Sequence, residues 1–97
     1  DVVIPDKRQL FHNYPNPFNQ QTVLRFQINC RENVELTIYD ILGRKVKTLV
    51  YSILSPGEYK FNWDGKNSLG QSVSSGVYLY VFKTDNFEKI KKMLLIR

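Results

Sequence analysis

Apolar and polar residues alternate along much of this chain, with the period of a strand that buries one face. The first alternating run covers residues 22–30, and the side chains it predicts to be buried are Leu24, Phe26, Ile28 and Cys30. The second covers residues 34–40, and its predicted buried side chains are Val34, Leu36 and Ile38. Only a short polar turn separates the two runs, so they are predicted to pair as an antiparallel hairpin.

Further strands are predicted downstream. A strand is indicated over residues 44–51, and Pro56-Gly57 then marks a turn. GEYKFNW (57–63) alternates again, and its predicted inward side chains are Tyr59, Phe61 and Trp63. A long polar loop follows before the next apolar run.

The last two strands are predicted on either side of a short turn. Residues 76–84 are apolar on both faces, as expected for a strand in the middle of a sandwich. Residues 87–97 follow the turn TDN and are predicted as the final strand, in preference to a helix. About seven short strands separated by turns predict an all-β protein, an antiparallel β-sandwich. Residues 1–9 are predicted to be a linker from an upstream domain, and residues 10–97 the sandwich.

NYPNPFN (13–19) is predicted to be a protected edge segment. Both residues that precede a proline avoid the helical region, so this stretch is predicted to be extended. The missing proline N–H groups leave donors on one side only, which suits the edge of a sheet. Tyr14 and Phe18 are predicted to pack on the core, and Asn13 and Asn16 to accept bonds from nearby backbone N–H groups.

Composition fits one folded domain. The 97 residues are 42% hydrophobic and 24% charged, so disorder is not indicated. The net charge of +5 predicts affinity for anionic surfaces, with lipopolysaccharide as a candidate. The basic residues are scattered and no nucleic-acid module is present, so no nucleic-acid partner is predicted. Cys30 is the only cysteine, which excludes an internal disulfide, and it is predicted to lie in the core.

The sequence predicts no enzyme, no cofactor and no metal site. His12 is the only histidine, and no nucleophile is paired with a base. The spacing of Asp64, Asn67 and Gly70 does not match a calcium loop, so these residues are predicted to form a turn. Outward-facing Tyr39 and Tyr51 leave a carbohydrate-binding accessory module as one alternative.

Five phrases in a fixed order resemble a known family. NYPNPFN, TVLRFQI, ELTIYDILGRKVKTLV, SPGEYKFNWDGKNSLGQSVSSGVYLYVF and KKMLLIR together resemble the type A C-terminal sorting domain of the type IX secretion system. The resemblance covers residues 10–97 and implies an immunoglobulin-like sandwich. Its middle part also resembles the immunoglobulin-like domain of the flagellar hook-capping protein. Gln20 departs from the sorting-domain pattern, which often has proline there.

The resemblance implies a role in export. Such domains follow a cargo domain, cross the periplasm, and are recognised by an outer-membrane secretion apparatus. A sortase-like peptidase often removes them, here near residues 1–10, and leaves the cargo on the cell surface or in the medium. The residues implied in recognition by the secretion machinery are Lys91, Lys92, Met93, Leu94, Leu95, Ile96 and Arg97. The residues implied to hold the fold are Asn13, Pro15, Asn16, Pro17, Phe18, Gly43, Gly57, Trp63, Asp64, Gly65, Gly76, Val77 and Tyr78.

Two other interpretations stay open. The chain could be a structural immunoglobulin-like spacer or assembly module of the hook-capping type. Alternatively, it could bind carbohydrate. A basic edge strand also suits strand addition to a partner, and exposed edges allow a strand-exchanged dimer.

Overall fold

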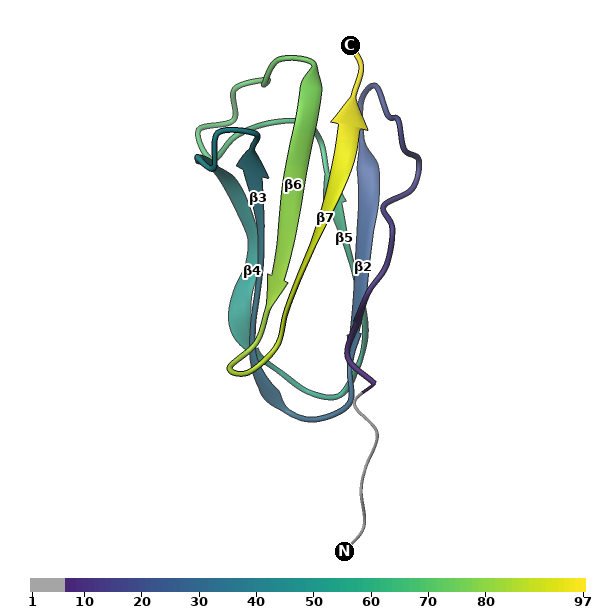
Figure 1. The fold of residues 1–97 in the computed structure, drawn as a ribbon, viewed down its shortest axis with the longest axis vertical. Helices are drawn as coiled ribbons and strands as arrows, with labels where there is room; N and C mark the ends of the chain where they lie inside the picture. Colours follow the sequence, from purple (N-terminus) through teal and green to yellow (C-terminus); the bar gives the residue numbers. More distant parts are fainter. Residues whose placement is uncertain (1–6) are drawn as a thin grey trace, which may run out of the picture.

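Seven antiparallel strands form two packed sheets (Figure 1). A computed structural model describes residues 7–97. The strands are β1 (Gln9–Leu10), β2 (Thr22–Ile28), β3 (Glu32–Asp40), β4 (Lys45–Leu54), β5 (Gly57–Trp63), β6 (Gly76–Lys83) and β7 (Glu88–Leu95). One sheet has the order β1-β2-β5 and the other β4-β3-β6-β7. The predicted all-β, immunoglobulin-like sandwich is confirmed, and β6 is central in its sheet as predicted.

The predicted hairpin of the first two long strands is wrong. β2 pairs with β1 and β5, whereas β3 pairs with β4 and β6, so the two strands lie in different sheets. Their alternation is real, because both apolar faces are buried, but they face each other across the core instead of pairing side by side. Cys30 lies in the crossing after β2 and is exposed, which corrects the prediction that it is buried.

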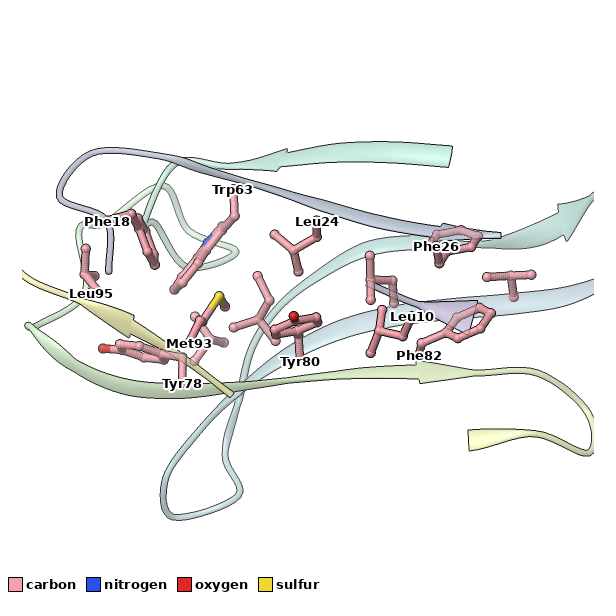
Figure 2. Close-up of a cluster of buried hydrophobic side chains, with 14 of the residues drawn as sticks. Leu10, Phe18, Leu24, Phe26, Trp63, Tyr78, Tyr80, Phe82, Met93 and Leu95 are labelled. Carbon is pink, nitrogen blue, oxygen red and sulfur yellow. The ribbon is translucent and has the colours of Figure 1, made fainter. Parts of the chain in front are cut away.

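The core is a layer of aromatic and aliphatic side chains between the sheets. Leu24, Phe26 and Trp63 point inward from one sheet and meet Tyr80 and Phe82 from the other (Figure 2). The rings of Phe26 and Phe82 stack with centroids 4.7 Å apart. Each large side chain that is fully buried stabilises the fold by about 1.5–3 kcal/mol. A core of this kind holds the sandwich together without a disulfide.

The NYPNPFN segment connects the two sheets along one side of the sandwich. Tyr14 exchanges backbone hydrogen bonds of 3.1 and 2.9 Å with Val23 of β2. Four residues later the Phe18 N–H donates to the Leu94 carbonyl of β7 over 3.0 Å, and Phe18 forms a parallel bridge with Leu95. The segment therefore covers the part of β2 that the short β1 leaves unpaired and the end of β7, on the same side of the molecule.

Three details of the prediction for this segment are corrected. Residues 15–17 bend instead of running extended, and both X-Pro peptide bonds are cis. Phe18 is buried as predicted, but Tyr14 is 80% exposed. The Asn16 side chain accepts its bond from distant Leu94, and the Asn13 amide donates to Thr22 instead of accepting a local bond.

Residues at the start of the described chain pack onto the sandwich. The Arg8 guanidinium donates to Glu32 over 3.2 Å and to Thr84 over 3.1 Å, and it lies over the ring of Phe87. Gln9 begins β1. The remaining residues of the predicted linker, 1–6, lie outside the described part of the chain. Within residues 7–97 no helix is long and apolar enough to cross a bilayer.

We predict that Tyr80→Phe destabilises the fold. The Tyr80 hydroxyl accepts from the Asn13 N–H and donates to the Phe11 carbonyl, both over 3.0 Å. Removing it leaves a buried donor and an acceptor unpaired, so the free energy of unfolding should fall by about 1–3 kcal/mol. Urea denaturation at neutral pH measures this change. The exposed Tyr51→Phe is the control, and an equal loss in both variants would contradict the assignment.

The fold should also lose stability at alkaline pH. Burial raises the pKa of Tyr80 and of Tyr78 above the ordinary phenol value. The native state therefore holds these protons more tightly than the unfolded state does, and stability falls as pH rises above about 10. Urea midpoints measured on either side of that pH should show this fall, and Tyr80→Phe should show less of it. A fall that is undiminished in Tyr80→Phe would exclude Tyr80 as a source.

Candidate protein-interaction site

The seven residues implied in recognition divide between the core and the surface. Met93 and Leu95 are 2% and 0% exposed and belong to the core cluster. Lys92 and Ile96 are exposed, and Leu94 is half-buried. Lys91 is half-buried on the same face as Met93 and Leu95, and Arg97 is exposed. Side chains alternate along a strand, so Met93 and Leu95 cannot touch a partner while the domain stays folded.

Backbone groups at the C-terminal end of β7 are already in use. The Leu94 N–H donates to the Asn16 side-chain oxygen over 3.0 Å, and the Leu94 carbonyl accepts from Phe18. The Ile96 N–H donates to the Phe18 carbonyl over 2.8 Å. The NYPNPFN segment thus covers this half of the strand edge. A partner strand therefore cannot pair along the whole of residues 91–97.

The other half of the β7 edge is open among the described residues. β7 is the last strand of its sheet, and its pairing with β6 runs without a bulge from Glu88 to Leu95. Because alternate residues of a strand point their backbone groups to the same side, Ile90 and Lys92 direct theirs outward as Leu94 does. No strand of residues 7–97 pairs with them. With Glu88, which has the same orientation, this is an unpaired edge of three outward-facing residues.

Arg97 holds a loop of its own domain. Its side chain donates to the carbonyl oxygens of Gly65 and Val73, over 2.6 and 2.8 Å, and its backbone N–H donates to Ser75 over 2.8 Å. Gly65 has a φ of +72°, and a Cβ there would lie 2.5 Å from the guanidinium. Glycine is favoured here by the left-handed backbone angle, and its missing side chain leaves the space that the guanidinium occupies.

An apolar groove of about 600 Å³ adjoins this edge on the outer face of the four-stranded sheet. Its walls include Pro17, Ile41, Val77, Leu79, Lys92 and Leu94. Val77 was implied to hold the fold, yet it faces solvent and lines this groove. Alternation in the sequence already places Val77 and Leu79 opposite the buried tyrosines, which is the signal that reveals the groove.

The remaining residues implied to hold the fold lie in the core, in turns, or at the start of a strand, as Gly57 and Gly76 do. The Trp63 indole donates to the Lys66 carbonyl over 2.9 Å, and its ring packs edge-on against Tyr78. Asp64 accepts from the Lys66 N–H, which begins the turn over 64–70. Gly43 closes the turn after β3 with a φ of +82°. These residues stabilise the fold, so β7 and the groove remain as the surface available to partners.

His12 and the residues considered for a calcium loop lie at the surface or in a turn. His12 is exposed, and residues 7–97 contain no cluster of three or more His, Cys, Asp or Glu side chains that could hold a metal. The Asn67 side-chain oxygen accepts from the N–H groups of Leu69 and Gln71, both over 3.0 Å, so this stretch is the turn that was predicted. Asp40, in another turn, has its pKa lowered mainly by a backbone hydrogen bond from Arg44.

The two tyrosines proposed for sugar binding differ in exposure. Tyr51 is 75% exposed and borders a shallow polar cleft with Asn33, Glu35 and Asp85. Tyr39 is half-buried and does not border that cleft. The two rings therefore do not form one platform.

Comparison with known proteins identifies the type of domain. Residues 15–86 match the FlgD Ig-like domain family, and the match ends before β7. The fold resembles part of dimeric latent PorU from Porphyromonas gingivalis, with 25% identity and a TM-score of 0.72 over 99% of this chain and 10% of that chain. No curated protein sequence matches the chain.

Two further solved structures share the fold. PorZ, an essential surface component of the type IX secretion system of Porphyromonas gingivalis, is 21% identical with a TM-score of 0.59, over 91% of this chain and 11% of that chain. FlgD from P. aeruginosa is 17% identical with a TM-score of 0.58, over 97% of this chain and 74% of that chain. The chain thus spans about a tenth of PorU and of PorZ.

We predict that Asn16→Ala uncovers the Leu94 amide. The Asn16 oxygen is the acceptor for that N–H, so its loss should speed hydrogen exchange at Leu94 by about tenfold. Exchange at Ile96 should stay slow, because Phe18 still accepts its N–H. Amide-resolved exchange by NMR makes the comparison. Asn19→Ala, at an exposed neighbouring position, is the control. Unchanged exchange at Leu94 in Asn16→Ala would contradict the role given to the hydrogen bond from the Leu94 N–H to Asn16.

Proposed function

The chain belongs to the FlgD Ig-like domain family, and we propose that it is a non-catalytic sorting domain that directs a cargo protein through the type IX secretion system. Its proposed partner is the outer-membrane secretion apparatus, and its proposed destination is the cell surface or the medium. The observation that carries the proposal is the likeness to a domain of PorU across 99% of this chain. The sequence resemblance to sorting domains supports it independently.

The proposed contact is the open half of the β7 edge. Adding a strand to an exposed sheet edge is a common mode of peptide recognition, and its affinity comes from main-chain hydrogen bonds. Ile90 and Lys92 present the outward N–H and carbonyl groups that this mode needs. Of the seven residues implied in recognition, this assigns Lys92 to the contact, Met93 and Leu95 to the core, and Arg97 to the loop that it holds.

Deletion of residues 91–97 cannot test this contact, because it also removes two core side chains. Lys92→Pro is a sharper change. Proline removes only the outward N–H, which β6 does not use, and it is tolerated on edge strands for that reason. We predict that a reporter fused to the Lys92→Pro domain is exported at least about tenfold less than the wild-type fusion by cells that carry the secretion system.

Lys92→Ala is the matched control, since it removes the charge but keeps the N–H. Its export should fall much less than that of Lys92→Pro, because Lys92→Ala keeps the main-chain hydrogen bonds that supply the affinity. Thermal unfolding of the purified domains checks that both variants fold. Wild-type export of a folded Lys92→Pro fusion would refute strand addition at this edge.

A structural assembly module of the hook-capping type is the second candidate. The family match and the shared fold with FlgD favour it. In this case the domain would join other subunits without directing export. Replacing it with an unrelated sandwich domain in the native protein separates the two roles: a sorting domain is needed for the cargo to leave the cell, whereas a spacer is not.

A further inference from the structure

The outer face of the four-stranded sheet carries apolar surface that the fold itself does not cover. Val77 and Leu79 of β6 lie on this face, opposite the buried Tyr78 and Tyr80. Ile41, in the turn after β3, is 72% exposed beside them. Contiguous apolar surface bordered by polar residues on a small domain marks an interaction site.

This surface forms the groove described above, and the groove begins at the covered end of the β7 edge. Pro17 and Leu94 line it beside that end, Leu79 lines it from β6, and Ile41 lines it from the turn after β3. Lys92 is exposed at the side, and it has no ion-pair partner in the described part of the chain. The lysine whose backbone faces the open edge therefore also borders the groove.

The NYPNPFN segment determines where an added strand must go. A chain that pairs with Ile90 and Lys92 meets Asn16 and Phe18 at the next position along β7, where those residues already hold Leu94. The inner side is closed, because Phe18, Met93 and Leu95 are buried there. An incoming chain that stays in contact with the domain therefore turns onto the outer face, where the groove lies.

We infer that the groove binds apolar side chains of a partner protein's extended segment after that segment has paired with the open half of β7. The inference rests on the proposed function. It specifies the partner sequence: a short β-forming stretch, followed by apolar residues that contact Leu79 and Val77, with a carboxylate near Lys92. The backbone edge supplies affinity, and the groove supplies selectivity among extended chains.

Charge favours such a partner over a second copy of this chain. The chain carries a net charge of +5, and two copies joined through this face would bring two Lys92 side chains together. Like charges across an interface oppose association, whereas an acidic segment complements Lys92.

The test uses a phage-displayed library of random linear peptides, selected on the full chain. We expect the selected peptides to combine apolar residues with Asp or Glu. Their dissociation constants, measured by fluorescence anisotropy, should rise about tenfold or more in Leu79→Lys. They should also rise in Lys92→Glu and in Lys92→Pro.

Val81→Lys is the matched control, because Val81 lies on the same face of β6 two residues beyond Leu79 and outside the groove. It should change the dissociation constant by less than about twofold. If Leu79→Lys does not fold, Val77→Lys replaces it, since Val77 is already 36% exposed and lines the same groove.

Each outcome decides between the edge and the groove. Loss of binding in Lys92→Pro but not in Leu79→Lys overturns the groove and leaves the proposed edge contact intact. Loss in Leu79→Lys but not in Lys92→Pro overturns the path along the edge, and with it the proposed contact. Failure to select any peptide overturns the inference, as does groove-dependent self-association or groove-dependent binding to anionic vesicles.

Discussion

The hydrogen bonds of Phe18 with β7 are the contact on which one whole side of this sandwich depends. Two sheets that face each other leave open edges, and open edges invite unwanted pairing. Here one short segment pairs with a strand of each sheet. Tyr14 pairs with β2, and Phe18 pairs with β7 and buries its ring against Trp63. The segment pairs with β2 at Tyr14 and covers β7 only from Leu94 onward. It therefore also determines which part of β7 stays accessible.

The sequence predicted the strands and their buried faces well. Alternation alone located the inward side chains of β2 and β3, and the two apolar faces of residues 76–83 correctly placed β6 inside its sheet. Strand pairing could not be derived in the same way. Period-two alternation shows that a face is buried, but it does not tell whether the neighbour lies beside the strand or across the core. The wrong prediction that Cys30 is buried has a related cause. The alternation was extended past the end of β2, whereas Cys30 lies where the chain crosses between sheets.

The candidate site was only partly predictable. Motif resemblance pointed to residues 91–97, and the structure puts an edge strand there, but alternation assigns Met93 and Leu95 to the core and leaves Lys92 at the surface. The hydrogen bond from the Leu94 N–H to the Asn16 side chain could not be predicted, because it joins residues 78 positions apart. The local turn chemistry of asparagine suggested short-range bonds, and a long-range contact took their place. The groove was visible in the alternation of β6, since a central strand that is apolar on both faces needs a second covered face.

The Arg97 side chain, described above as holding the loop at Gly65, links the completion of the fold to the emergence of the last strand. Before β7 is present, Phe18 has no backbone partner, the core lacks Met93 and Leu95, and the long loop lacks the hydrogen bonds from the Arg97 side chain. Contacts that close over such sequence separations form late and slowly in β proteins. A chain leaving the ribosome or a narrow channel would therefore keep an incomplete sandwich until β7 and Arg97 are free. At that moment the edge, the groove and the loop would become ordered together.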